Sequence, residues 1–525
     1  MSALLVPDDS EANERYRRFR IAGMPLWATV FLILTAAISL LTAHYRVIGG
    51  DDILELWGDN VSSIGQLLHV ERITPIEIDP VVYPGLTYVG IHIFGVNPPF
   101  LRLPSILGFL LMQVCLFYFV RRVASETAAI FALACPAISG AFEYTMQIRP
   151  YGVLLGLFGL AMLSWQTAVR RETHRSWPLV VLALSIAVAI NTHYYGVLLL
   201  VPLFAAELVR VWQSRKVDVP VLVSMGAGMA GVVFLLPFLK GAAGFRNHYQ
   251  AGAVPYHVIT QSYNFLLLGR GVFSIKTNHL LAIGLGLFFV LVLWGCIRQL
   301  SSKTLLDAEF VFLITLSALP FVGFLLGRFV THAMEPRYAL GSVIGIAALL
   351  SIALVPLFRN DTIGRVALLL LFAAFAWMGL LGVRAEQRAR QNALASLIVS
   401  PEIMTAVMAS PSKLLYTQDI DLFGFVAYHE PNADVRSHMA LVYSTDQEMR
   451  WNRSATSSRI AIHLKSVQPY KILSYENVKT EPGEHIFVVA QGGWNWIEQA
   501  FAAEPVEIRP IGHAFGREVV SVRFP

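Results

Sequence analysis

Acidic side chains gather directly after the first apolar run of this sequence. Asp51 and Asp52 follow Gly50, and Glu55 shares a helical face with either of them. A carboxylate can act as a general base toward an acceptor hydroxyl. Asp51 and Asp52 cannot both face one pocket, because neighbouring side chains point about 100° apart on a helix. We predict that one is the catalytic base and the other orients it or binds the acceptor, with a plain helix N-cap as the open alternative.

Arginine, histidine and tyrosine residues recur at the ends of later apolar runs, on the membrane side where Asp51 is expected. Arginine forks bind phosphate oxygens in bidentate fashion and stay charged, so such a set suits an anionic, lipid-linked substrate. The alternative is that the arginines only snorkel to lipid headgroups and the tyrosines anchor the chain in the interface. The candidate substrate-binding residues are Glu55, Tyr83, Arg149, Tyr151, His193, Tyr194, Arg246, His248, Glu335, Arg337 and Tyr338.

The composition requires a membrane to position these residues. The 525 residues are 55% hydrophobic and 14% charged, whereas soluble domains carry about 25% charged residues. With a mean hydropathy of +0.58, the chain is neither a soluble globule nor a disordered, collagen-like or coiled-coil protein. Because a span needs roughly 20 apolar residues, we predict an all-α polytopic domain of about eleven transmembrane helices. The predicted spans are 23–43, 101–121, 124–142, 150–169, 177–192, 194–212, 218–238, 279–298, 309–327, 337–358 and 363–383.

Lysine and arginine residues are concentrated in every second loop, beginning before the first span. Because positively charged loops stay in the cytoplasm, we predict that residues 1–22 are cytoplasmic and that the protein lies in the inner (plasma) membrane. Residues 44–100 then form one long outer loop. Its segment 83–95 is too short to span, and we expect a helix in the interface with Tyr83 and Tyr88 at the level of the headgroups.

The C-terminal part of the chain has a different composition. About 20% of residues 384–525 are charged, which is near the value for soluble domains. Strand-like apolar runs alternate with helical stretches, and this pattern predicts an extracytoplasmic α/β domain after a transmembrane domain of residues 23–383. The predicted strands are 413–416, 438–444, 485–490 and 519–524, and the predicted helices are 385–399, 419–428 and 494–502.

Motifs for nucleotides and metals are weak. Gly226, Gly228 and Gly231 match GxGxxG, but they fall within a span, where small residues let helices approach closely. The histidines lack paired metal-ligand spacing, and the cysteines lie inside apolar segments. We predict no cofactor, with a divalent cation at the acidic pair as the open alternative. The net charge of +5 fits the basic loops of membrane proteins, so no nucleic-acid partner is predicted.

Four stretches, in their order and spacing, resemble the GT-C glycosyltransferases of the protein-mannosyltransferase type, family 39, with the lipid A aminoarabinose transferases among its bacterial relatives. Gly50-Asp51-Asp52 stands where that family has an acidic pair, usually Asp-Glu, after the first span. The resemblance covers about residues 20–380. The second stretch is similar to the family's interfacial helix followed by Leu-Arg-Leu-Pro. It runs from Tyr83-Pro84-Gly85-Leu86-Thr87-Tyr88 through Phe94-Gly95 to Leu101-Arg102-Leu103-Pro104-Ser105. The third and fourth are similar to two arginine–tyrosine motifs, and they are Arg149-Pro150-Tyr151 and Glu335-Pro336-Arg337-Tyr338.

This resemblance implies inverting transfer of a sugar from a polyprenyl-phosphate donor. It assigns Asp51 as catalytic base with Asp52 second, and it places Arg149 and Arg337 near the donor phosphate. Two departures matter. The second acid is Asp52 rather than Glu, and the Lys-Pro-Pro of aminoarabinose transferases is replaced by a stretch that begins with Tyr83. The second departure argues against an aminoarabinose donor and leaves the sugar open.

We therefore expect an integral-membrane glycosyltransferase, surrounded by membrane lipids, that passes the sugar to an envelope glycan, a lipid or a protein on the outer side. Three alternatives belong to other classes. A transporter or lipid flippase would carry ionisable residues in mid-membrane and repeated halves. A polymerase or ligase would use a polyprenyl diphosphate. A sensor would bind its ligand with the C-terminal domain and only signal through the membrane part.

Overall fold

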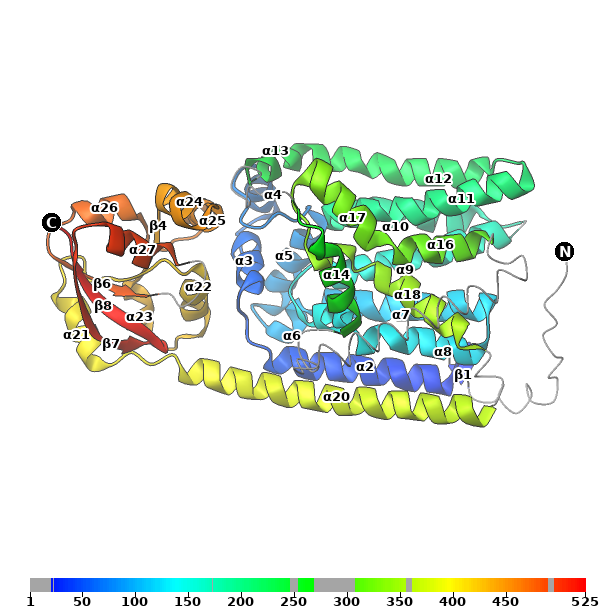
Figure 1. Ribbon diagram of the computed structural model, residues 1–525, viewed down its shortest axis with the longest axis horizontal. Helices are drawn as coiled ribbons and strands as arrows, with labels where there is room; N and C mark the ends of the chain where they lie inside the picture. The colour runs from blue at the N-terminus through cyan, green and yellow to red at the C-terminus, as the bar shows by residue number, and fades with distance from the viewer. Residues whose placement is uncertain are drawn as a thin grey trace.

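The molecule consists of a long bundle of helices and a smaller C-terminal α/β domain, which lies at one end of the bundle (Figure 1). Helix α20 (Asp361–Ala395) runs along the bundle beside α2 (Leu26–Tyr45) and leads into the C-terminal domain. The computed structural model describes residues 20–21, 23–171, 173–245, 254–268, 307–355, 361–489 and 495–525.

The helices of the bundle are apolar on their outer surface as well as inside. Leu208 is 70% exposed and Leu370 is 66% exposed, and a continuous apolar exterior of this kind needs lipid as its solvent. Six described helices are long and apolar enough to cross a membrane. The chain is thus a multi-pass membrane protein. The six are Leu26–Tyr45, Leu103–Val123, Tyr151–Arg170, Tyr194–Ser214, Val219–Gly241 and Thr362–Ala395.

Two of the expected spans are bent, and counting each as one span gives up to eight in the described part of the chain. In the second, Pro320 lies in the first turn after the bend and lacks the backbone donor that a continuous helix needs there. The expected span 279–298 lies outside the described residues, so the total of eleven stays a prediction. The bent pairs are Glu126–Ile138 with Gly140–Met146, at 67°, and Ala308–Ser317 with Leu319–Thr331, at 56°; the shorter apolar helices are Ser176–Thr192 and Ser342–Ala353.

Short elements begin, connect and complete these spans. Several are 3-10 turns, which are common where an α-helix ends or bends. The first two strands form a small antiparallel pair. The elements are β1 (Arg20–Ile21), β2 (Met24–Pro25), α6 (Pro98–Leu101), α8 (Glu126–Ala134), η1 (Cys135–Ile138), η2 (Gly140–Met146), α10 (Ser176–Thr192), η3 (Tyr194–Leu199), α11 (Leu200–Ser214), α12 (Val219–Met229), η4 (Ala230–Leu235), α13 (Leu236–Phe245), α14 (His257–Leu268), α16 (Ala308–Ser317), α17 (Leu319–Leu326), η6 (Gly327–Thr331), η7 (Pro336–Ala339) and α18 (Ser342–Ala353).

A row of glycines brings α7 (Leu103–Val123) against α9 (Tyr151–Arg170). A Cβ on Gly152 would lie 2.3 Å from the carbonyl oxygen of Ser105, and one on Gly108 would lie 2.3 Å from that of Gly152. Backbone contact of this kind is how small residues join helices in lipid. The contact also fixes the start of α9, because Ser105 Oγ donates a hydrogen bond of 2.6 Å to the carbonyl oxygen of Arg149, which lies just before this helix.

Replacing Gly152 by alanine should destabilise the membrane domain by about 1–3 kcal/mol, the usual cost of overpacking a tight contact. The new Cβ would meet backbone atoms, which cannot rotate away, so the two helices must separate. Thermal unfolding in detergent measures the loss. Gly226→Ala is the matched control, because its Cβ would meet nothing within 4 Å. Equal stability of Gly152→Ala and wild type would contradict the tight contact.

Helices α3 (Asp51–Asp59), α4 (Ile64–Ile73) and α5 (Val82–Phe94) lie between the bundle and the C-terminal domain (Figure 1). The chain can turn abruptly from α2 into α3 because Gly50 takes φ 54° and ψ −132°, a conformation open to glycine and strained for other residues. Tyr83, which was expected at the level of the headgroups, does not face lipid. Its side chain is fully buried in the core that α3 and α5 share, since α3 covers it.

The C-terminal domain has a six-stranded sheet of order β5-β4-β3-β6-β8-β7, which confirms the expected α/β class. The first four strands of this order are parallel, and β8 and β7 continue the sheet in antiparallel fashion. The strand order reverses at β3, which has β4 on one side and β6 on the other. The strands are β3 (Leu415–Thr417), β4 (Met439–Tyr443), β5 (Ile472–Ser474), β6 (Glu484–Val488), β7 (Glu507–Ala514) and β8 (Arg517–Arg523).

Helix α20 does not end at residue 383, where the sequence suggested a domain boundary. It continues to Ala395, because residues 384–395 are mostly strong helix formers without glycine or proline. The sheet domain therefore begins later than expected. Its helices are α21 (Pro401–Ala409), α22 (Ile420–His429), α23 (Ala433–His438), α24 (Thr445–Asn452), α25 (Thr456–Val467), α26 (Tyr475–Thr480) and α27 (Trp496–Ala503).

The C-terminal domain docks on α3 through apolar and polar contacts. Gly424 of α22 approaches Ile53 so closely that a Cβ would lie 2.5 Å from that side chain. Trp57 Nε1 donates to Tyr470 Oη at 3.2 Å, and His429 Nε2 donates to the Ile48 carbonyl at 2.9 Å. Apolar residues of both parts form one buried cluster. This docking holds the beginning of α3 between the bundle and the sheet domain.

Candidate active site

Asp51 lies in the first turn of α3, beside two guanidinium groups that come from distant parts of the bundle. Arg337 Nη1, in η7, donates to Asp51 Oδ2 at 2.7 Å. Arg149 Nη1, just before α9, lies 3.9 Å from the same oxygen and is buried. The Asp51 side chain keeps 43% of its surface exposed, so a substrate can reach it. The structure thus brings together a carboxylate and two cationic groups named from the sequence.

These arginines set the charge state of Asp51. Burial alone would raise the pKa of the Asp51 carboxyl, but the charges of Arg149 and Arg337 and the hydrogen bond from Arg337 more than offset it. The pKa therefore lies below its usual value of 3.8. At neutral pH the group is an ionised carboxylate, as a general base must be.

Aromatic rings enclose the two arginines. The ring of Tyr338 lies 5.2 Å from that of His193, and the ring of His193 lies 5.3 Å from that of Tyr151. The Arg337 guanidinium is 6.0 Å from the ring centres of both Tyr151 and Tyr338, which is at the outer range of cation–π attraction. Burial, Arg149 and Arg337 lower the pKa of His193 to about 3, so this imidazole is neutral. Its Nδ1 accepts a hydrogen bond of 3.1 Å from the Tyr195 backbone amide, which leaves the Nε2 proton free to be donated.

Asp52 points away from this group. Its Oδ2 accepts a hydrogen bond of 2.6 Å from Arg102 Nη2, and its Oδ1 accepts one of 2.9 Å from the Ile148 backbone amide. Arg102, with no exposed surface, also donates to the carbonyls of Ala43 and Arg46 at 2.9 Å each. These are carbonyls at the end of α2 that a helix leaves without partners. The Asp52–Arg102 pair therefore ties α2, α3, α7 and the start of α9 together.

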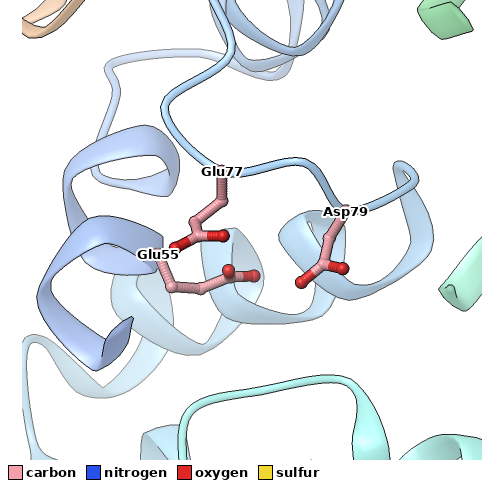
Figure 2. Close-up of side chains that lie close together, drawn as sticks. All are labelled: Glu55, Glu77 and Asp79. Atoms are coloured by element: carbon pink, nitrogen blue, oxygen red, sulfur yellow. The ribbon is translucent and has the colours of Figure 1, made fainter. Parts of the chain in front are cut away.

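A second group of carboxyls lies on the other side of Arg149. Glu77, in the loop before α5, lies 2.9 Å from Arg149 Nη1, and burial raises its pKa to about 7. Figure 2 shows the carboxyl groups of Glu55, Glu77 and Asp79 converging from α3 and this loop. Their ligand oxygens lie within 4.8 Å of one another, a spacing that could hold a metal ion. Burial and neighbouring acids also raise the pKa of Glu55, and Asp59 and Glu71 lie close behind.

Most residues named from the sequence meet here, and a few do not. Glu335 is exposed, next to Arg337 in the chain. Tyr194 lies within electrostatic reach of Asp79, and the buried Tyr83 lies within reach of Glu55. Arg246 and His248 lie outside the described residues. The sequence analysis selected Glu77, Asp79 and Arg102 for no role, although Glu-x-Asp spacing puts two acids on one side of an extended segment and Arg102 lies in the Leu-Arg-Leu-Pro stretch.

Comparison with known proteins relates this chain to one fold. Residues 79–240 match the family model of dolichyl-phosphate-mannose-protein mannosyltransferase. The crystal structure of ArnT from Cupriavidus metallidurans bound to undecaprenyl phosphate has a TM-score of 0.55 at 14% identity, with 94% of this chain and 98% of that chain covered. The chain has the GT-C fold. The apo form of the same GT-C protein also gives a TM-score of 0.55, at 12% identity, with 94% of this chain and 97% of that chain covered.

A weaker likeness is to another solved structure. The oligosaccharyltransferase of Archaeoglobus fulgidus in complex with Zn and sulfate has a TM-score of 0.43 at 13% identity, covering 78% of this chain and 61% of that chain. None of the curated protein sequences matches this chain. The resemblance to GT-C glycosyltransferases that the sequence indicated is confirmed. In this GT-C protein, Asp51 lies in the first turn of α3, soon after the first span, and α3 lies at the end of the bundle that faces the C-terminal domain (Figure 1).

Proposed function

We propose that the protein is an inverting glycosyltransferase that moves a sugar from a polyprenyl-phosphate donor to a hydroxyl acceptor at the outer face of the inner (plasma) membrane. One observation carries this proposal. The carboxylate of Asp51 lies 2.7 Å from Arg337 and 3.9 Å from Arg149, so a general base and two phosphate-binding groups share one accessible site. The GT-C fold and the match to a mannosyltransferase family model support it.

The chemistry is a single displacement. Asp51 takes the proton of the acceptor hydroxyl while that oxygen attacks the anomeric carbon from the side opposite the phosphate. The bond between that carbon and the phosphate oxygen breaks, and the polyprenyl phosphate leaves with the electron pair. Arg149 and Arg337 neutralise the charge that develops on the leaving phosphate. One displacement inverts the configuration at the anomeric carbon.

The donor fits the cationic side of this site. Guanidinium groups bind phosphate oxygens in bidentate fashion and do not lose their charge. The related ArnT structure contains undecaprenyl phosphate, and a sugar carried by a lipid of this kind is the donor that we propose. An aminoarabinose donor is disfavoured, because Tyr83 stands in place of the lysine of that branch and is buried.

The acceptor would approach from the side of the C-terminal domain. Asp421, in the first turn of α22, is exposed. Although its surface is exposed, desolvation by the surrounding protein, together with the charges of Asp419 and Asp51, raises its pKa to about 6, so its carboxyl lies within electrostatic reach of the base. It lies one turn before Gly424, which contacts α3. We propose that this side binds the acceptor, whose hydroxyl belongs to an envelope glycan, a lipid or a protein.

A donor assay tests the proposal. Purified full-length protein in detergent is given radiolabelled sugars on polyprenyl monophosphate or diphosphate, together with an envelope lipid and glycan fraction. We expect label to move to an acceptor from the monophosphate and not from the diphosphate. Transfer from the diphosphate alone would identify a ligase or polymerase. Translocation of intact donor lipid in vesicles, without cleavage of the phosphosugar, would identify a flippase.

Replacing Arg337 by glutamine should raise the pH at which the enzyme loses activity when the solution is acidified. The variant loses one of two positive charges that stabilise the ionised Asp51, so the pKa of Asp51 rises. A nearby opposite charge lowers a carboxyl pKa by about 1–3 units, so the acidic limb of kcat should move up by at least about one unit. Because the base acts only when ionised, activity falls earlier on acidification. A pH profile of kcat at saturating donor checks this shift.

The control for this profile is Arg46→Gln. Arg46 pairs with Glu386 at 3.7 Å, away from Asp51, so its removal should leave the acidic limb in place. If Arg337→Gln and Arg46→Gln gave the same limb as wild type, Arg337 would not tune the base.

A further inference from the structure

Three carboxyl groups converge in a buried space beside Asp51, and the proposed displacement leaves them without a role. Glu55 comes from α3, and Glu77 and Asp79 come from the loop between α4 and α5 (Figure 2). Their ligand oxygens lie within 4.8 Å of one another. Two oxygens bound to one Mg²⁺, Mn²⁺ or Ca²⁺ at about 2.0–2.6 Å are no more than about 5 Å apart. The spacing fits one coordination shell.

Glu55 is the observation that points to a ligand. Its side chain is 98% buried, since only 2% of the residue is exposed, and it extends toward the other two carboxyls (Figure 2). Among the described residues, neither of its carboxyl oxygens has a hydrogen-bond partner, and Oδ2 of Asp79 has none either. A buried carboxylate without a donor is costly unless a charge compensates it. These orphaned oxygens face the shared space.

Among the described residues, no cationic group donates a hydrogen bond to the Glu55 carboxylate, although the charge of Arg149 acts on it. Arg149 contacts Glu77 at 2.9 Å and Asp51 at 3.9 Å. His193 Nε2 lies 4.0 Å from Asp79 Oδ1. Two further acids, Asp59 and Glu71, lie behind the three carboxyls and within electrostatic reach of them.

We infer that Glu55, Glu77 and Asp79 bind one hard divalent cation, of the Mg²⁺, Mn²⁺ or Ca²⁺ class. All three ligands are carboxylate oxygens, which these cations prefer, and water completes the shell. The cation joins α3 to the loop that carries Glu77 and thereby holds Glu77 against Arg149. This inference goes beyond the proposed reaction and does not depend on it, because it concerns a binding site that exists before any substrate arrives.

Mn²⁺ binding to the full-length protein in detergent tests the site. The protein is stripped with EDTA, desalted and titrated with Mn²⁺, while electron paramagnetic resonance follows the signal of free Mn²⁺. We expect wild type to remove a single stoichiometric equivalent from the free signal, and Mg²⁺ or Ca²⁺ to compete for it. Glu55→Gln should weaken Mn²⁺ binding by more than about tenfold, because even the loss of a residue that hydrogen-bonds a metal ligand lowers metal affinity by about 10–100-fold. Glu386→Gln, a distant acid that pairs with Arg46, should bind like wild type.

Thermal unfolding keeps the test independent of folding defects. In EDTA, Glu55→Gln should unfold at or above the wild-type temperature, because it removes a buried carboxyl group that has no hydrogen-bond partner among the described residues. Mn²⁺ should raise the unfolding temperature of wild type and not that of Glu55→Gln or of Asp79→Asn. Absence of saturable binding to wild type, or equal binding to Glu55→Gln, overturns the inference. No substrate is used, so failure here and failure of sugar transfer are separate results.

Discussion

Replacing Asp51 by asparagine should lower kcat for sugar transfer by about 10²- to 10⁴-fold, the contribution of a positioned general base. Asparagine keeps the shape of the side chain and its hydrogen bond from Arg337, but it cannot take the acceptor proton. The donor KM should stay the same or fall, because the site loses a negative charge that repels phosphate. Initial rates at several donor concentrations separate kcat from KM.

Stability distinguishes this catalytic effect from a structural one. Asp51 keeps 43% of its side chain exposed, and asparagine retains an oxygen that can accept the hydrogen bond from Arg337, so Asp51→Asn should unfold near the wild-type temperature. The control for the loss of one charge is Asp434→Asn, because Asp434 is an exposed acid of α23. This variant should be fully active. Full transfer activity of Asp51→Asn would remove Asp51 from the role of base.

Replacing Arg102 by glutamine should destabilise the protein by about 3–5 kcal/mol, as expected when one partner of a buried ion pair is removed. Asp52 would keep a buried charge without a counterion, and the last carbonyls of α2 would lose donors at 2.9 Å. Thermal or denaturant unfolding in detergent measures the change. The effect should reach the start of α9, because Asp52 also holds the Ile148 amide.

A double-mutant cycle identifies the pair as the cause. Arg102→Gln combined with Asp52→Asn should cost clearly less than the sum of the single changes, because both removed charges belonged to each other. Arg523→Gln is the control, since Arg523 pairs with Glu484 at the surface at 3.1 Å and is 57% exposed. Such pairs contribute about 0–1 kcal/mol. Additive single effects at Arg102 and Asp52 would contradict the buried pair.

Much of the site could be predicted from the sequence, because chemistry at the ends of apolar runs is visible without coordinates. The rule that neighbouring side chains diverge by about 100° already required Asp51 and Asp52 to face different surroundings. The structure agrees, with Asp51 at Arg337 and Asp52 at Arg102. The proposed roles of Asp51 as base and of Arg149 and Arg337 as phosphate ligands stay predictions until activity is measured.

Other features depended on contacts between distant segments. The burial of Tyr83 follows from α3 covering α5, and hydropathy does not encode which segment covers which. The convergence of Glu55 with Glu77 and Asp79 results from how the loop before α5 folds back over α3. Likewise, two of the expected spans are bent, and α20 continues past residue 383. These differences from the sequence prediction concern where the helices begin and end, and not whether the segments are helical.

The apolar cluster that joins the C-terminal domain to α3 has a consequence for engineering. A chimaera that exchanges only residues 396–525 with those of a relative would cut through shared packing, such as Gly424 against Ile53. Truncation would likewise strip Trp57 of its partner Tyr470. We therefore expect acceptor preference to transfer between relatives only when the segment from α3 to α5 is grafted together with the sheet domain, as one inherited unit.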